Sequence, residues 1–179
     1  PIENGKITED FKLRAGLPTV KLCLENASEV IAMGHIGRPG GKAVSELSVE
    51  PIRKWFENQG LKLKILENLR FDPREDTCDP AYAGELAAMG EVYINEAFAA
   101  HHPAVSTTVL PTLLPHFAGL RFAKEVEKLT TVKNNPKKPY VAIMGGVKVA
   151  DKLQVIEVLA KVADAVLVGG KLVHEIGDE

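Results

Sequence analysis

Two strand ends in this sequence, at residues 33–41 and 141–152, combine glycines with cationic side chains, a pattern that favours binding of an anion. Residues 33–41 form the end of an apolar run and a loop with four glycines, His35 and Arg38. Main-chain N–H groups of glycines can approach an anion closely, and arginine can hold a phosphate or carboxylate with two parallel hydrogen bonds. The alternative is a flexible surface turn with an exposed cation, because glycine-rich strand–loop junctions are common.

Two further strand ends carry polar groups. Residues 65–71 bring Arg70 to the end of an apolar run, where the alternative is an ordinary ion pair. Residues 92–102 end in His101 and His102. Adjacent residues of an extended segment point to opposite faces, so we expect no metal ion shared by these histidines. A structural histidine is the alternative for either one.

A fourth segment, residues 141–152, predicts a phosphate site. It is an apolar strand followed by Gly145 and Gly146, and then by a helix whose first turns carry Lys148 and Lys152. Unpaired N–H groups and the helix dipole favour negative charge at a helix N-terminus, and lysines four residues apart share one helix face. The segment is neither a Walker A loop nor a dinucleotide Gly-x-Gly-x-x-Gly motif, so the pattern alone indicates only a phosphate.

Short apolar runs alternate with amphipathic stretches along the chain, which predicts an α/β fold with a parallel, Rossmann-like sheet flanked by helices. Asp79 and Pro80 predict a helix start, and Gly60 and Gly90 predict helix ends. The expected strands are residues 30–33, 63–66, 92–94, 140–144 and 165–168, and the expected helices are residues 9–26, 48–58, 80–89, 122–132 and 152–162.

The clearest boundary is the polar segment 132–139, which contains two prolines and follows a charged helix. We interpret that helix as a connector and residue 140 as the start of a second α/β unit. A β-α-β unit of about forty residues cannot bury both faces of its own sheet, so we expect this second unit to be incomplete.

Composition excludes several classes of protein. The chain has 179 residues and a formal net charge of −2, without the basic excess of a nucleic-acid-binding protein. Cys23 and Cys78 are far apart and fit no zinc spacing, so we expect reduced thiols in an intracellular, cytoplasmic protein. No apolar run approaches the ~18 residues of a membrane span, and residues 1–5 do not start a signal peptide, so no membrane partner is expected.

Four motifs and two shorter segments, which occur in the family's order, resemble those of phosphoglycerate kinases. Residues 34–39 (Gly-His-Ile-Gly-Arg-Pro) are similar to the family's Ser-His-Leu-Gly-Arg-Pro, and residues 66–71 match its Leu-Glu-Asn-Leu-Arg-Phe. Residues 95–98 (Asn-Glu-Ala-Phe) resemble Asn-Asp-Ala-Phe, and residues 144–152 resemble Leu-Gly-Gly-Ala-Lys-Val-Ser-Asp-Lys. The segments at 5–8 and 17–19 also fall where the family has them. The resemblance covers essentially the whole chain.

This resemblance implies a phosphoglycerate kinase fold, with two α/β domains that face a cleft. Residues 1–121 would be the phosphoglycerate-binding domain without its first strand, 122–139 the interdomain helix and linker, and 140–179 the start of the nucleotide-binding domain. The implied enzyme is a phosphotransferase with a carboxylate acceptor, which moves a phosphoryl group between 1,3-bisphosphoglycerate and ADP in glycolysis. Its products are 3-phosphoglycerate and ATP, magnesium arrives with the nucleotide rather than on protein ligands, and we expect a monomer.

The resemblance also assigns candidate site residues. Catalysis here requires cations that cancel charge on the moving phosphoryl group more than it requires a general base, and Arg38 and Lys152 are the catalytic candidates. The acid substrate would be bound by Lys12, His35, Gly37, Arg38, Arg70 and His102, and the nucleotide by Gly145, Gly146, Lys148 and Lys152.

Several departures weaken the implied site. The chain begins at the proline that ends the family's Arg-Val-Asp-Phe-Asn-Val-Pro strand, and the adenosine pocket and acidic loop would follow residue 179. Lys12, Pro103 and Val105 replace a family Arg, Arg and His, and lysine lacks the forked geometry of arginine. Between Gly60 and Leu63 the family has an extra strand and helix.

We therefore expect this polypeptide alone to turn over little or no substrate. The alternative function is a non-catalytic module, derived from the family, that binds an anionic metabolite. A third reading, an unrelated α/β phosphate-binding enzyme, would require the His35 and Arg70 loops to lie at opposite ends of the sheet.

Overall fold

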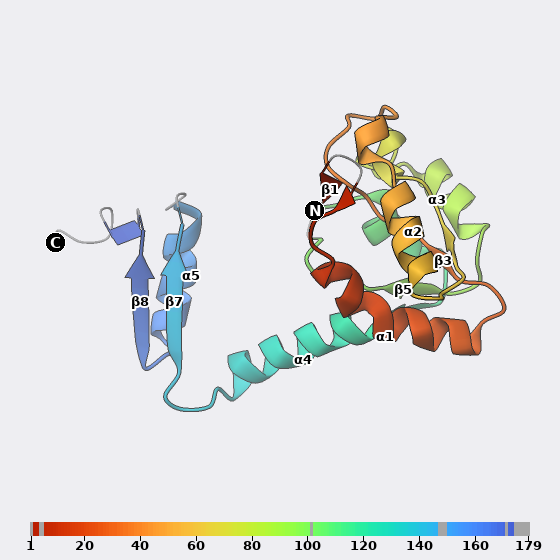
Figure 1. Cartoon of the computed structure of the whole chain (residues 1–179). Coiled ribbons are helices and arrows are strands. Elements are labelled where there is room, and N and C mark those ends of the chain that lie inside the picture. The colour runs from red at the N-terminus through yellow and green to blue at the C-terminus, as the bar shows by residue number, and fades with distance from the viewer. Residues whose placement is uncertain (1, 4–5, 101, 147–149, 171, 174–179) are drawn as a thin grey trace. The chain divides into compact units, whose positions relative to one another are not determined.

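The computed structural model describes residues 2–3, 6–100, 102–146, 150–170 and 172–173, without the side chains of residues 3 and 150–152. The chain divides into two compact units, Pro1–Val126 and Glu127–Glu179, and each is described by itself (Figure 1). Helix α4 (Leu120–Asn134) begins in the first unit and ends in the second.

The first unit alternates strands with helices, as the sequence predicts. Its elements before α4 are β1 (Ile2–Glu3), β2 (Lys6–Ile7), α1 (Phe11–Asn26), β3 (Ile31–Ala32), η1 (Ser45–Leu47), α2 (Glu50–Asn58), β4 (Lys64–Ile65), η2 (Leu69–Phe71), α3 (Pro80–Ala87), β5 (Tyr93–Asn95), η3 (Val105–Val109), η4 (Leu110–Thr112) and β6 (His116–Ala118).

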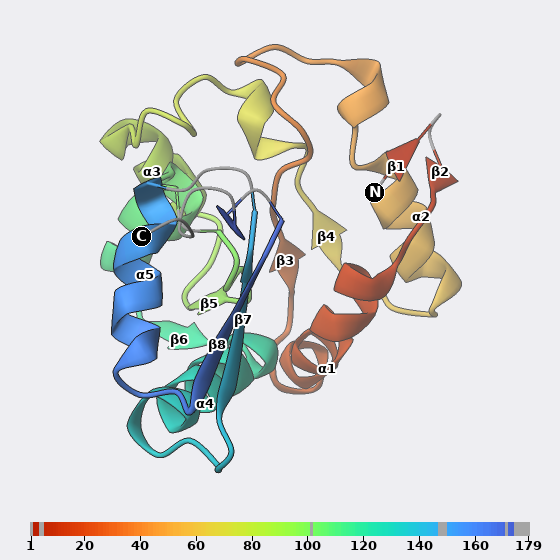
Figure 2. The ribbon, with the colours of Figure 1, turned by 90° about the vertical axis from the view of Figure 1, so that its left-hand side faces the viewer.

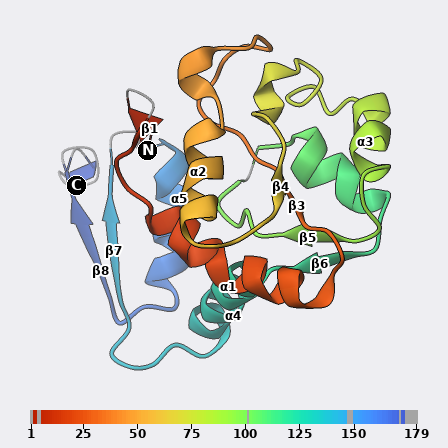
Figure 3. The ribbon, with the colours of Figure 1, turned by 45° about the vertical axis from the view of Figure 1, so that its right-hand side comes forward.

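The strands of this unit form pairs. Strand β3 runs parallel to β4, and β5 runs parallel to β6, as Figure 3 shows. Strands β1 and β2 form a small antiparallel hairpin beside α2 (Figure 2). The parallel pairing that the sequence predicts is confirmed for β3 with β4 and for β5 with β6. Strand β6 was not expected, because the sequence His-Phe-Ala lacks β-branched residues and all three side chains are exposed.

The core of the first unit is a cluster of buried residues packed around α3. Leu69, Tyr93, Val105 and Leu110 are buried there, together with Ala83 and Leu86 of α3 itself. These residues come from η2, α3, β5, η3 and η4, so the segment that contains Arg70 is attached directly to the core. Burial of such apolar side chains is the main stabilising contribution to a unit of this size.

Helix α3 starts where the sequence predicts. The Asp79 carboxylate accepts a hydrogen bond from the backbone N–H of Tyr82 (2.9 Å), and Pro80 occupies the first helical position. Asp79→Ala is expected to lower the free energy of unfolding by about 1 kcal/mol, because one N–H at the helix start loses its acceptor. Urea denaturation would measure this, with Asp79→Ser as the control that keeps a cap. An alanine variant as stable as the serine variant would contradict the prediction.

The second unit contains β7 (Val141–Gly145), α5 (Ala150–Ala160) and β8 (Ala165–Gly169). The strands are parallel, with Ile143 opposite Leu167, and α5 lies against one side of the pair (Figure 1). The other side is apolar but exposed: Ile143 is 79% exposed and Leu167 54%. The expectation of an incomplete second unit is confirmed.

Neither unit contains, within the described residues, a helix with the length and apolar character required to cross a bilayer.

Candidate functional site

The segment 66–71 connects three parts of the first unit. The Glu67 carboxylate accepts hydrogen bonds from the backbone N–H of Val49 (2.8 Å) and from the hydroxyl of Ser48 (3.0 Å), just before α2. Partial burial opposes ionisation of Glu67, but hydrogen bonds from the N–H groups of Asn68 and Val49 hold its pKa below the ordinary value. Leu69 lies in the core. Glu67 and Leu69 therefore attach this segment to the start of α2 and to the core.

Asn68 joins this segment to the glycine-rich loop. It is 2% exposed, and its side-chain amide donates to the carbonyl oxygens of Ile36 (2.8 Å) and Leu47 (2.9 Å). Its side-chain oxygen accepts from the backbone N–H groups of Ile36 (3.3 Å) and Arg70 (3.2 Å). Sequence analysis included Asn68 in a motif but gave it no role. The structure shows that it fixes the His35 loop relative to Arg70.

Arg70 lies between the glycine-rich loop and the following turn. Its Nη1 donates to the carbonyl oxygen of Gly37 (3.0 Å), and its Nε donates to Oδ1 of Asp76 (2.9 Å). The Arg70 side chain is only 14% exposed, whereas that of Asp76 is 54% exposed. Gly37 has a φ of 64°, a conformation that favours glycine, and so turns the loop at the residue that receives Arg70.

His35 shares this electrostatic environment. The residue is exposed as a whole, but nearby protein atoms displace water from the ring and lower its pKa. The positive charge of Arg70 lowers the pKa further, and the negative charge of Asp76 opposes both effects. The structure therefore brings His35, Gly37 and Arg70 together at one place, as the sequence predicts. The reading that required their loops at opposite ends of the sheet is not supported.

The turn after Arg70 is held by a buried acid. Glu75 is fully buried, and its carboxylate accepts hydrogen bonds from the hydroxyl (2.5 Å) and backbone N–H (3.2 Å) of Ser106. Its own carbonyl oxygen accepts from the N–H of Val105 (2.9 Å). Burial raises the pKa of Glu75 despite these hydrogen bonds. Glu75 fixes the backbone beside Asp76, a role that no sequence pattern indicated.

The other expected acid-substrate residues are more dispersed. Arg38 follows Gly37 and is exposed, and none of the contacts found among the described residues engages its side chain. Lys12 is exposed in the first turn of α1, and His102 is exposed in the loop after β5. Val105, which replaces a family His, is fully buried in the core. The side chain of Val105 is therefore not accessible to a ligand.

The expected phosphate site of the second unit is only partly described. Gly145 ends β7, Gly146 follows with a φ of 141°, and α5 begins at Ala150, so the strand–loop–helix order is present. Lys148 lies outside the described residues, and the side chain of Lys152 lies outside them too.

A second polar cluster, missed by sequence analysis, lies at the start of α4. Glu96 accepts hydrogen bonds from the N–H groups of Arg121 (3.1 Å) and Phe122 (3.2 Å) and from the hydroxyl of Thr19 (2.6 Å). The Thr19 hydroxyl in turn accepts from the N–H of Leu120 (2.9 Å). Glu96 belongs to the segment 95–98, so this family-like motif caps the connecting helix.

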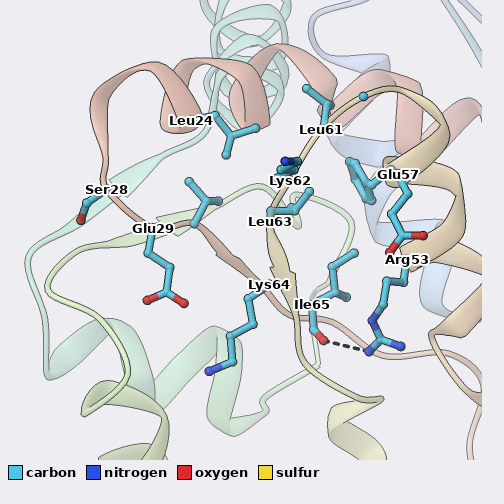
Figure 4. Close-up of a pocket in the computed structure, with 13 residues that line it drawn as sticks. Leu24, Ser28, Glu29, Arg53, Glu57, Leu61, Lys62, Leu63, Lys64 and Ile65 are labelled. Atoms are coloured by element: carbon cyan, nitrogen blue, oxygen red, sulfur yellow. Dashed lines mark hydrogen bonds between the residues drawn. The ribbon is translucent and has the colours of Figure 1, made fainter.

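A pocket of about 490 Å³ lies elsewhere in the first unit. Figure 4 shows that its lining includes Leu24, Glu29, Arg53 and residues 61–65, and Arg53 donates to the carbonyl oxygen of Ile65 (3.1 Å). These residues adjoin the beginnings of β3 and β4, whereas His35 and Arg70 follow their ends. The pocket is therefore separate from the Arg70 cluster. Among the described residues, no group of three or more His, Cys, Asp and Glu side chains could hold a metal ion.

Comparison with known proteins gives a consistent result. The family model described as phosphoglycerate kinase matches residues 1–65 and 57–176. The phosphoglycerate kinase of Moorella thermoacetica is 37% identical over 199 residues, which cover 97% of this chain and 51% of the relative. The phosphoglycerate kinase of Roseiflexus castenholzii is 37% identical over 213 residues, which cover 99% of this chain and 54% of the relative. The chain spans about half the length of the curated relatives it matches.

Solved structures agree with the sequence matches. The phosphoglycerate kinase structure from Coxiella burnetii has a TM-score of 0.86 and 31% identity, covering 95% of this chain and 48% of its own. The phosphoglycerate kinase structure from Pyrococcus horikoshii has a TM-score of 0.80 and 27% identity. The match covers 97% of this chain and 51% of that structure's chain.

The comparisons also locate a difference within the matched region. The 199 aligned positions exceed the 179 residues of this chain by 20, so the Moorella relative has at least 20 residues without a counterpart here. The two matches to the family model overlap at residues 57–65, around the place where the sequence predicts an absent strand and helix. The pocket is lined by residues of this same segment.

Proposed function

The chain belongs to the phosphoglycerate kinase family, and from this premise we propose that it supplies the acid-substrate side of a phosphoryl transfer. In the proposed reaction, 1,3-bisphosphoglycerate and ADP are converted to 3-phosphoglycerate and ATP, with magnesium carried by the nucleotide. The observation that carries the proposal is the cluster of Arg70, Gly37 and His35, which places a largely buried guanidinium beside an imidazole.

The chemistry of this cluster suits a small phosphorylated acid. A guanidinium binds carboxylate and phosphate oxygens through charge-assisted hydrogen bonds, and partial burial strengthens such interactions. Arg38, in the same loop, offers a second, exposed guanidinium. We propose that His35, Gly37, Arg38 and Arg70 bind the acid substrate, with Lys12 and His102 contributing charge at its margin, and that Arg38 also acts in catalysis.

We assign the nucleotide to the second unit. The proposal places its phosphates at the turn between β7 and α5, near Gly145 and Gly146, with Lys148 and Lys152 as the cations and Lys152 acting on the transferred group. Residues 1–121, 122–139 and 140–179 then correspond to the acid-binding domain, the connector and the start of the nucleotide domain. By the same family relationship, we propose a monomeric, cytoplasmic glycolytic enzyme.

One observation favours a second candidate function, a non-catalytic module that binds an anionic metabolite. The family's His position is occupied by Val105, which is part of the core, and the neighbouring family Arg is Pro103. Two cationic groups are therefore missing from the acid site. A coupled assay of the 179-residue chain tests whether it is catalytically competent by itself, and we expect little or no ATP formation. Turnover near ordinary kinase rates would eliminate the second candidate.

Binding tests the acid site directly. Arg70→Ala is expected to weaken binding of 3-phosphoglycerate to this chain by tenfold or more, about 1.4 kcal/mol, because the only largely buried guanidinium of the described cluster is lost. Isothermal titration calorimetry at a fixed salt concentration would measure the dissociation constants of the two chains.

The matched control is Lys54→Gln, which removes one positive charge from an exposed pair with Glu50 on α2. We expect Lys54→Gln to bind like the unmodified chain. Equal affinities for Arg70→Ala and the unmodified chain would refute the assigned acid site.

A further inference from the structure

The two arginines of the segment 70–76 are held in different ways. Arg74 pairs with Asp72 (2.7 Å) and Glu85 (2.7 Å), its Nε and both terminal nitrogens donate, and its guanidinium lies 4.7 Å from the centre of the Tyr82 ring. Its pKa is raised by the hydrogen bonds with Asp72 and Glu85. Arg74 is therefore fully engaged within the protein and has little capacity left for a ligand.

Arg70 is engaged only in part. Nη1 is held by the Gly37 carbonyl and Nε by Asp76, but no contact in the described part of the chain uses Nη2. The edge formed by Nε and Nη2 is one that a carboxylate or phosphate can bind with two parallel hydrogen bonds. Asp76 uses this edge through Nε alone. An anionic ligand that binds the edge fully must displace the Asp76 carboxylate.

The surroundings determine which partner can move. Arg70 is held by its bond to the Gly37 carbonyl and is 14% exposed, so its guanidinium is fixed. The backbone next to Asp76 is fixed by the contacts of Glu75 with Ser106 and Val105. The Asp76 side chain is 54% exposed and makes no second hydrogen bond or ion pair among the described residues. Rotation of the Asp76 side chain into water is therefore the movement with the smallest cost.

We propose that Asp76 is an internal competitor for the anion at Arg70, occupying the guanidinium in the free protein and leaving it when a phosphorylated acid binds. This inference rests on the proposed acid site and adds a residue that sets its affinity. Asp76 keeps the Arg70 charge compensated when no ligand is present. It also selects for ligands with enough negative charge to replace a carboxylate, so a doubly charged phosphate displaces it more readily than a simple monocarboxylate does.

The test compares Asp76→Asn with Glu91→Gln. The asparagine keeps the shape of Asp76 and removes its charge, and Glu91 is an exposed acid with no contact to Arg70 among the described residues. Each full chain is titrated with 3-phosphoglycerate and, separately, with inorganic phosphate. Binding to Asp76→Asn should be tighter by about threefold to fivefold, the upper part of the range for a partly exposed ion pair. Glu91→Gln should bind like the unmodified chain.

A second readout needs no ligand. Because Asp76 raises the pKa of His35 while Arg70 lowers it, Asp76→Asn should lower the pKa of His35 in an NMR titration, and Glu91→Gln should leave it unchanged. This pKa tests whether the Asp76 charge acts on the His35–Arg70 cluster in the free protein. The affinity then separates the roles, because a role limited to folding would not tighten anion binding.

The outcomes separate the two proposals. If the unmodified chain binds 3-phosphoglycerate but Asp76→Asn binds it equally or more weakly, Asp76 orients Arg70 instead of competing, and this inference alone fails. If neither chain binds either anion, the proposed acid site fails and the inference fails with it.

Discussion

Asn68→Asp is expected to lower the free energy of unfolding by about 3 kcal/mol at neutral pH, because it exchanges two donors for an acceptor in a buried position. The side-chain amide of Asn68 donates to the carbonyl oxygens of Ile36 and Leu47 at 2.8 and 2.9 Å. In the variant, a carboxylate oxygen of the same size faces both carbonyls. Asn68 is 2% exposed, so the introduced carboxylate would have little access to water.

Repulsion by these carbonyls and burial both disfavour the ionised form, so the introduced carboxyl should have a raised pKa in the folded state. A carboxyl with a raised pKa costs stability above its unfolded pKa, about 3.9 for aspartate, and this cost disappears as the pH falls. The deficit of the variant should therefore be larger at pH 7 than at pH 5. Chemical denaturation at both pH values would measure the difference.

The matched control is Asn58→Asp, the same chemical change at the exposed last residue of α2. It should lower the free energy of unfolding by no more than about 1 kcal/mol, because its charge is exposed and only the helix dipole opposes it. A loss for Asn68→Asp as small as that of the control would show that the amide does not hold the two loops together. The same variant should also weaken anion binding, because the His35 loop and Arg70 would lose their common anchor.

Sequence analysis predicted the regular elements well because their signals are local. The expected strand at 140–144 is found as β7, and the expected helix at 80–89 is found as α3 with Asp79 as its cap. Apolar runs and caps depend on neighbours within a few residues, and these are visible in the letters. Strand β6 was missed because its pairing with β5 depends on backbone hydrogen bonds rather than on its side chains.

The candidate site was predicted only in part, for a physical reason. The approach of His35 and Arg70 follows from their position after parallel strands that are neighbours in space. The contacts of Asn68 with Ile36 span 32 residues, and those of Glu96 with Thr19 span 77, so no local pattern contains them. The burial of Val105 could have been anticipated, because an apolar β-branched residue is typical of a core.

Gly119→Ala is expected to lower the free energy of unfolding by about 2 kcal/mol, through loss of the polar cap on α4. A methyl group at Gly119 would lie 2.0 Å from Oε2 of Glu96, so the carboxylate would have to move away. Glu96 and Thr19 together satisfy the N–H groups of residues 120–122, the first three of the helix. The carboxylate also places negative charge at the positive end of the helix dipole.

The control for backbone effects is Gly84→Ala, a change within α3 where an added methyl group would meet nothing within 4 Å. Alanine stabilises helices relative to glycine, so this variant should gain about 0.5–1 kcal/mol. Glu96→Gln should fall between Gly119→Ala and the unmodified chain, because the amide keeps one acceptor and loses the charge. Thermal and urea denaturation of the three variants would establish the order.

The order of these variants in free energy of unfolding decides whether the start of the connecting helix is stabilised by tertiary contacts or by its own sequence. The N–H groups of residues 120–122 take their acceptors from α1 and from the end of β5, at Thr19 and Glu96. If Gly119→Ala were as stable as the unmodified chain, α4 would start without help from the first unit. If Gly119→Ala loses stability as expected, the segment 95–98 stabilises the start of the connecting helix through its hydrogen bonds from the unit that contains Arg70.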